Sequence, residues 1–137
     1  MASETPDVTS TAPGYRLVER DGYVHVALRG RPRLKMVLSM FGELEKLTTN
    51  DAELLVLIDE SEMKAALLSP GELRAMIDGL KASPGLSRSR IAIYAPSPLV
   101  YGLNRMAQAF AGERWEHRLK AFRSEDEAER WLLGENE

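Results

Sequence analysis

The chain has 137 residues, of which 44% are hydrophobic, and its 18 Lys and Arg against 21 Asp and Glu give a formal net charge of −3 at pH 7. This composition is typical of one globular domain. It contains no cysteine, which excludes a disulfide scaffold, thiol catalysis and Cys-ligated metal centres. The acidic balance argues against a general nucleic-acid binder, and no apolar run approaches the ~20 residues of a membrane span.

Residues 1–14 are rich in Ser, Thr and Pro and hold almost no large apolar side chain. Such a segment buries too little surface to offset the entropy of ordering, so we expect a disordered N-terminal tail. It also lacks the basic start and apolar stretch of a secretory signal. We therefore expect a cytoplasmic protein with a single domain over residues 15–137.

The pair Asp21-Gly22 separates two alternating segments, residues 15–20 and 23–30. This pattern predicts a β-hairpin whose type I′ turn has positive φ at both central positions. Both faces of the second segment are largely apolar, which indicates a central strand that is covered on both sides. We interpret His25 in this strand as a core-facing residue whose ring has a hydrogen-bond partner.

Apolar strands then alternate with amphipathic helices, and serines followed by Pro, or by Glu three residues later, mark helix starts. The order predicts an α/β domain: a mostly parallel five-stranded sheet with an antiparallel edge hairpin and four helices, joined by right-handed crossovers. The expected helices cover residues 32–48, 69–81, 97–111 and 124–132, and the further strands cover residues 53–59, 90–95 and 115–122.

Two segments carry a family resemblance. The stretch IAIYAPSPLVYGLNRMAQAF (91–110) joins a strand, a Ser-Pro cap and a Tyr-Gly-Leu-x-Arg-Met helix, and AFRSEDEAERWL (121–132) joins a strand and a helix. On these segments and on the element order, residues 15–134 resemble the bacterial SpoIIAA-like family, a STAS/SEC14-type domain. The resemblance implies a small α/β domain with no established enzymatic activity. The STAS side implies docking of a protein partner, and the SEC14 side implies an apolar pocket for a lipid or similar ligand.

The resemblance also draws attention to one serine. In the anti-sigma-factor antagonists of the STAS class, a serine at the start of the second helix is phosphorylated, usually within Asp-Ser-Ser-Gly. The matching position is Ser69 in the segment Leu68-Ser69-Pro70-Gly71, where Gly71 fits the motif and the Asp and the second Ser are missing. Ser69 is therefore either a modification site implied by the resemblance or only a helix cap.

The carboxyl ends of the predicted parallel strands form the first candidate site, because ligands of open α/β sheets bind there and helix N-termini attract anions. Arg33 in the cationic segment 29–35 would supply positive charge, and Asp59 would lie at a strand tip. Ser69 and Ser97 would start two helices beside them. The alternative is that both serines only cap helices, at ~1 kcal/mol each, and that the cations are solvated.

Met36, Met40 and Leu47 lie beside the main apolar stripe of the helix over residues 32–48. Together they widen its apolar arc to about 200°, beyond the usual stripe of a surface helix. This helix either packs against two elements or offers these side chains to a partner or to a second copy. The connection 60–68, with its Ala-Ala-Leu-Leu run, is either an irregular plug of the core or a lid over a pocket.

Tyr101, Arg105 and Gln108 share one polar face of the helix over residues 97–111, which predicts that they point away from the sheet. Gly102 within this helix costs ~1 kcal/mol relative to Ala, which is best tolerated where another group approaches closely. The Tyr101–Arg105 pair is therefore either an exposed contact point or simply solvated.

The sequence contains no G-x-S-x-G elbow, no Walker A loop and no dinucleotide-binding glycine set, and neither histidine lies at a metal-ligand spacing. We therefore predict a non-enzymatic interaction module that docks a protein partner and self-associates as a homodimer, with no cofactor, no nucleic acid and no membrane span. The alternative is a SEC14-like binder of a small apolar or amphiphilic ligand, with a pocket of several hundred Å3 by the usual range. A hydrolase that pairs Asp59 with a serine is a third hypothesis.

Overall fold

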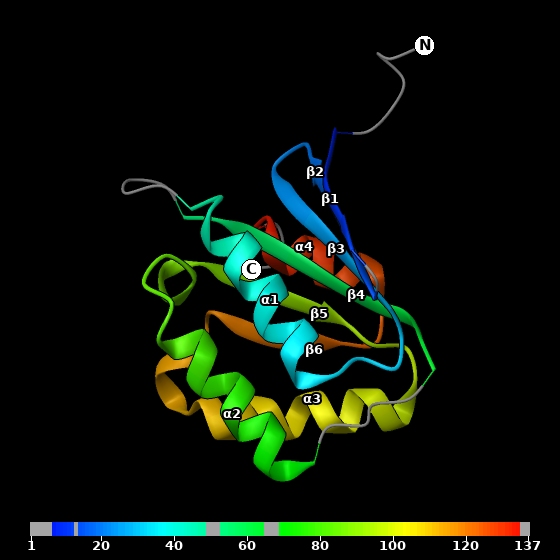
Figure 1. The fold of residues 1–137 in the computed structure, drawn as a ribbon, viewed down its shortest axis with the longest axis vertical. Helices are drawn as coiled ribbons and strands as arrows, with labels where there is room; N and C mark the ends of the chain where they lie inside the picture. The colour runs from blue at the N-terminus through cyan, green and yellow to red at the C-terminus, as the bar shows by residue number, and fades with distance from the viewer. Residues whose placement is uncertain (1–6, 13, 49–52, 65–68, 135–137) are drawn as a thin grey trace.

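The computed structural model describes residues 7–12, 14–48, 53–64 and 69–134, and these form one six-stranded mixed sheet with helices on both faces (Figure 1). The strands follow one another across the sheet in chain order. The first two pairings are antiparallel and the other three are parallel. The strands are β1 (Asp7–Ala12), β2 (Tyr15–Arg20), β3 (Tyr23–Gly30), β4 (Leu55–Met63), β5 (Arg90–Tyr94) and β6 (Leu119–Phe122).

Within the described residues, the α-helices are α1 (Leu34–Glu45), α2 (Pro70–Lys81), α3 (Pro98–Ala111) and α4 (Glu125–Leu132). The parallel strands β3 to β6 are added in one direction, so right-handed crossovers place α1, α2 and α3 on the same face of the sheet. Helix α4 follows the last strand and lies on the opposite face (Figure 1). The predicted α/β class, antiparallel hairpin and parallel crossovers are confirmed.

The face under α1, α2 and α3 carries the main hydrophobic core. Alternation along each strand sends one set of side chains to this face, such as Val26 from β3 and Val56 from β4. Leu44 of α1 and Ile77 of α2 pack against them and are 0% and 2% exposed. Burial of each such side chain stabilises the fold by roughly 1.5–3 kcal/mol, so this layer supplies most of the hydrophobic stabilisation.

A smaller apolar cluster fills the space between α4 and the sheet, and it includes Leu57 of β4 and Leu132 of α4. The hydroxyl of Tyr23 donates a 2.6 Å hydrogen bond to Glu129, which fixes α4 against β3. Helix α4 packs over β4, β5 and β6. The part of this face that β2 and β3 form therefore lies beside the helix rather than beneath it.

Strand β1 lies in the segment that the sequence analysis interpreted as a disordered tail. Residues 7–12 pair antiparallel with β2, from Asp7 opposite Glu19 to Ala12 opposite Tyr15. The tail prediction is wrong for this stretch, and the sheet has one strand more than predicted. Thr and Val favour extended backbone, and pairing with β2 gives this stretch backbone hydrogen bonds that hydropathy does not reveal. Residues 1–6 and 13 lie outside the described residues.

The predicted serine caps at Ser69 and Ser97 are confirmed, and they mark the starts of two helices correctly. Ser69 accepts a hydrogen bond from the Glu72 amide at 3.1 Å, and the Glu72 carboxylate accepts one from the Ser69 amide at 2.9 Å. This reciprocal pair is the predicted capping box. Ser97 accepts from the Val100 amide at the start of α3, which ends at Ala111 as expected.

Strand β4 continues to Met63 instead of ending at Asp59, so the interpretation of residues 60–63 as part of a connection is wrong. Strand β3 extends alongside and supplies the hydrogen-bond partners that hold this polar stretch in the sheet. The register changes here, because Ala27 pairs with Asp59 while Arg29 pairs with Glu62. The extra residue on β4 is a β-bulge. Residues 65–68, the Ala-Ala-Leu-Leu run, lie outside the described residues.

Two smaller predictions also need correction. The hairpin forms, but positive φ occurs at Gly22 (95°) and not at Asp21, so the turn is not type I′. Glycine alone takes this conformation without a Cβ penalty. The last strand begins at Leu119, because Trp115 belongs to a short 3-10 helix that precedes it.

Candidate functional site

A partly enclosed apolar cavity of about 60 Å3 lies between the sheet and helices α1, α2 and α3. Its walls include Leu28 of β3, Met40 of α1 and Ala107 of α3. About 10–15 Å3 of such space holds one water molecule, so the cavity has room for roughly four to six non-hydrogen atoms. It is smaller than the several hundred Å3 expected for a ligand pocket, but it lies against α1 and Glu60, within the region where the sequence analysis expected one.

Glu60 and Asn104 bring polar atoms to this apolar wall. The Asn104 amide nitrogen donates to the Glu60 carboxylate at 2.6 Å and to the Val100 carbonyl at 3.0 Å. Glu60 is 9% exposed and Asn104 is 8% exposed. Burial raises the pKa of Glu60 to about 7 from 4.5, against the opposing effect of the Asn104 hydrogen bond, and the negative charge of Asp59 raises it further. The group is therefore a proton-exchanging carboxyl near neutral pH.

The sequence analysis missed this pair. Glu60 lies on the same face of β4 as Val56 and Ile58, because side chains alternate along a strand. The sequence analysis ended this strand at Asp59 and therefore did not place Glu60 on the core face. Asn104 stands where a helix normally presents an apolar side chain to the core. A polar residue at a helix position that should be buried could have indicated this pair, because a buried polar group needs a hydrogen-bond partner.

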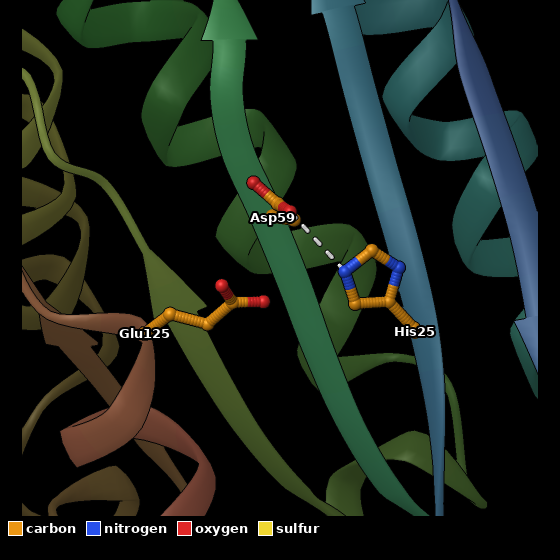
Figure 2. A group of neighbouring side chains, drawn as sticks. All are labelled: His25, Asp59 and Glu125. Atoms are coloured by element: carbon orange, nitrogen blue, oxygen red, sulfur yellow. Dashed lines mark hydrogen bonds and ion pairs between the residues drawn. The ribbon is translucent and has the colours of Figure 1, made fainter. Parts of the chain in front are cut away.

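The opposite face of the sheet holds a polar cluster around His25 and Asp59 (Figure 2). The His25 Nε2 atom lies 3.2 Å from Asp59 Oδ2, and the other carboxylate oxygen accepts hydrogen bonds from the Ser61 amide at 2.9 Å and the Ser61 hydroxyl at 2.6 Å. Glu125 of α4 points toward this pair from the other side. The prediction that His25 is buried with a satisfied ring is confirmed, since it is 7% exposed.

Hydrogen bonds control the charge of Asp59. Burial would raise its pKa, but the hydrogen bonds with His25 and from Ser61 outweigh burial and hold the pKa at about 2, below the usual 3.8. The carboxylate is therefore ionised over the whole physiological range. A hollow of about 380 Å3 opens beside it, lined by Arg16, Arg20 and other side chains of β2, β3 and β4.

The structure does not unite the residues of the predicted strand-end site. Asp59 is not at a strand tip, because β4 runs on to Met63, and its side chain faces the α4 side of the sheet. Ser69 and Ser97 start α2 and α3 on the other face, where each caps its helix. The predicted convergence of Asp59 with the two serines is therefore wrong.

The cations of segment 29–35 do lie together. Arg29, Arg31, Arg33 and Lys35 line one shallow hollow of about 600 Å3. Arg33 is the residue before α1, and its side chain makes no capping hydrogen bond. The guanidinium of Arg29 is 4.0 Å from the Glu62 carboxylate, a contact between two exposed side chains that contributes little.

The three side chains assigned to an interface on α1 differ in exposure. Met40 is 1% exposed and belongs to the core, so the core-packing alternative applies to it. Met36 and Leu47 are partly buried and pack against the same core cluster. The wide apolar arc of this helix therefore reflects contacts with both the sheet and α2.

On α3, Arg105 donates to the Tyr101 hydroxyl at 3.2 Å, so these two side chains form a pair as expected. Gln108 does not share their environment, because its amide oxygen accepts from the Ala121 amide of edge strand β6 at 3.1 Å. At Gly102, a Cβ would meet no described atom within 4 Å. No described part of the chain approaches this glycine closely.

Comparisons with known proteins support the fold. No family model matches the sequence, and no curated protein matches it. A crystal structure at 2.25 Å of an uncharacterised DUF3478-family protein from Shewanella loihica PV-4, described as having a SpoIIAA-like fold, matches with a TM-score of 0.58. The sequences are 23% identical over 90% of this chain and 98% of that one. The chain therefore has a SpoIIAA-like fold.

No helix among the described residues is long and apolar enough to cross a membrane.

Proposed function

Starting from the SpoIIAA-like fold, we propose that the protein is a non-enzymatic binding module that holds a small, mostly apolar ligand between its sheet and helices α1 to α3. The observation that carries this proposal is the apolar cavity of about 60 Å3 with the Glu60–Asn104 pair in its wall. Natural cores are normally packed with few voids larger than a water molecule. An apolar void beside a buried carboxyl is therefore better explained by a ligand than by packing alone.

The lining defines the chemical class of this ligand. Side chains such as Val37, Phe41 and Leu73 offer only apolar contacts. Asn104 uses its amide hydrogens on Glu60 and on the Val100 carbonyl, so its amide oxygen and the Glu60 carboxyl are the groups of this pair that remain for a ligand. A short amphiphile with one hydroxyl or amine fits this combination. Its apolar end fills the cavity while its polar group meets Glu60.

A cavity-filling variant tests the proposal. Ala107→Leu projects extra methyl groups into the cavity, and Ala109→Leu adds the same atoms to an exposed position of α3. We expect straight-chain 1-alcohols to bind the natural protein in isothermal titration calorimetry, with the best fit near four to six non-hydrogen atoms. Ala107→Leu should weaken binding at least tenfold, whereas Ala109→Leu should not change it. Equal binding by the two variants, or none by the natural protein, would refute the proposal.

One observation favours a second candidate function, the docking of a protein partner on α3. Leu99 is 66% exposed and Met106 is 39% exposed, and their spacing of seven residues places them on one helix face. Gly102 lies between them with open space beside it. The exposed guanidinium of Arg105 flanks this stripe and favours a partner whose apolar side chains are bordered by carboxylates.

A charge reversal distinguishes this docking function. If α3 binds such a partner, Arg105→Glu and Leu99→Asp should each abolish the complex isolated from the native host, while Arg114→Glu, an exposed change outside the stripe, should leave it intact. Each complex is followed by its molar mass in light scattering. Loss of the complex in all three variants would indicate non-specific charge effects and would contradict docking on α3.

A further inference from the structure

We infer that His25, Asp59 and Glu125 form a binding site for a divalent transition-metal ion on the α4 face of the sheet. This site is separate from the cavity, because the sheet itself lies between them. Its three side chains come from β3, β4 and the first turn of α4, segments that are far apart in the sequence. No spacing motif could therefore have indicated it.

The geometry already approaches that of a coordination sphere (Figure 2). One ligand atom from each of the three residues lies within 4.8 Å of the others. A zinc ion with bonds of ~2.0–2.2 Å holds tetrahedral neighbours ~3.4 Å apart. The His25 Nε2 to Asp59 Oδ2 distance of 3.2 Å meets this requirement. Glu125 is exposed, so its side chain can move the remaining distance, which is at most about 1.4 Å.

The supporting hydrogen bonds present Asp59 as a ligand. Ser61 donates to Asp59 Oδ1 from both its amide and its hydroxyl, which fixes the carboxylate plane and leaves Oδ2 facing His25. Oriented carboxylates of this kind are typical of metal sites, whose outer partners hold the ligands in place.

Access and charge also fit a bound cation. The hollow of about 380 Å3 beside Asp59 reaches solvent and leaves room for water on the metal. Glu19 and Glu62 line it together with Arg16 and Arg20. Arg29 adds a third cation, because its guanidinium is 4.0 Å from the Glu62 carboxylate. With Asp59 and Glu125 included, four carboxylates stand against three guanidiniums, so the surroundings are net negative. The arginines reduce the attraction, and we therefore expect micromolar rather than nanomolar affinity.

The ligand types select the metal. One imidazole nitrogen and two carboxylates favour Zn²⁺ and similar first-row ions, whereas Mg²⁺ and Ca²⁺ prefer oxygen ligands alone. When the metal binds, its bond to Nε2 replaces the hydrogen that this atom shares with Asp59. That proton either moves to Nδ1 or leaves to solvent, so no redox partner or co-reactant is needed.

The two histidines of the chain give the experiment an internal control. Zn²⁺ is titrated into the natural protein while the ring signals of His25 and His117 are followed by NMR. We expect the His25 signals to shift to saturation at one equivalent, while those of exposed His117 stay unchanged. Shifts at His117 alone, or none at His25, would overturn the site.

A matched pair of variants tests the third ligand. Glu125→Gln removes a carboxylate from the cluster, and Glu127→Gln removes one from the same first turn of α4 outside it. Both positions are exposed, so both variants should fold. We expect Glu125→Gln to weaken Zn²⁺ binding at least tenfold in calorimetry and Glu127→Gln to change it less than twofold. Equal affinity for the two variants would exclude Glu125 as a ligand and overturn the three-residue site.

Discussion

Asp59 and Glu60 are neighbours in the chain, yet their side chains lie on opposite faces of the sheet. Their pKa values are shifted in opposite directions from the ordinary values. Burial among apolar side chains raises the pKa of Glu60 to about 7. Hydrogen bonds with His25 and from Ser61 outweigh burial and lower the pKa of Asp59 to about 2. The same functional group thus becomes a proton-exchanging acid on one face and a permanent anion on the other.

The strand order explains this asymmetry. Adding β3 to β6 in one direction places three helices on one face and leaves the other to α4 alone. The crowded face excludes water, and a carboxyl there loses hydration. The open face carries the polar pair His25 and Asp59 beside a hollow that reaches solvent. Packing therefore dominates the first face and electrostatics the second, and changes on the two faces should have effects of different size and pH dependence.

The largest expected effect comes from the crowded face. Met40→Ala should lower the free energy of unfolding by about 3 kcal/mol, because it removes a fully buried side chain and leaves a void. Met106→Ala, on the exposed side of α3, should cost less than about 0.5 kcal/mol. Urea unfolding of the two variants measures the difference. A small loss for Met40→Ala would mean that this side chain is not a core residue.

The second prediction concerns Glu60. Its pKa is higher in the folded chain than the ordinary 4.5, so the folded state disfavours the charged form. The penalty is absent below pH 4.5, grows as the pH rises toward 7, and reaches about 3 kcal/mol above it, at ~1.36 kcal/mol per pKa unit. Glu60→Gln keeps an acceptor for Asn104 and removes the charge.

We therefore expect the natural protein to lose stability between pH 4.5 and 7 and the Glu60→Gln variant to lose much less there. Urea unfolding at several pH values measures both curves. The Glu62→Gln variant serves as the control, because it makes the same substitution at an exposed position of the same strand. Parallel curves for the natural protein and Glu60→Gln would contradict a raised pKa of Glu60.

The sequence predicted local features of the chain better than the pairing between its strands. Helix periodicity and serine caps placed α2 and α3, because these signals act within a few residues. The end of β4 was misplaced because its polar stretch is held by pairing with β3, a contact that no local pattern encodes. The same error hid Glu60 in the core layer and moved Asp59 to a strand tip. The pairing of His25 with Asp59 depends on strand register, which a single sequence does not reveal.

The third prediction concerns the open face. Asp59→Asn should cost about 1 kcal/mol at neutral pH, since it weakens charge-assisted hydrogen bonds with His25 and from Ser61. A lowered pKa stabilises the fold above pH 3.8, and this contribution is lost as the pH falls through about 2. In acid unfolding followed by circular dichroism, the stability of the variant should fall less steeply with pH between pH 3.8 and about 2 than that of the natural protein. An unchanged acid transition would mean that Asp59 is not held ionised by its neighbours.

The smallest expected effects are those of the helix caps, which also separate the two interpretations of Ser69. Ser69→Ala should cost ~1 kcal/mol, because it breaks the capping box at the start of α2. Ser97→Ala should cost about half as much, since its hydrogen bond to the Val100 amide is long, at 3.5 Å. Ser69→Asp retains a capping oxygen and adds negative charge at a helix N-terminus, so it should restore stability. If Ser69→Asp changes partner binding but not stability, Ser69 is a modification site. If the variant binds the partner as well as the natural protein does, Ser69 is only a helix cap.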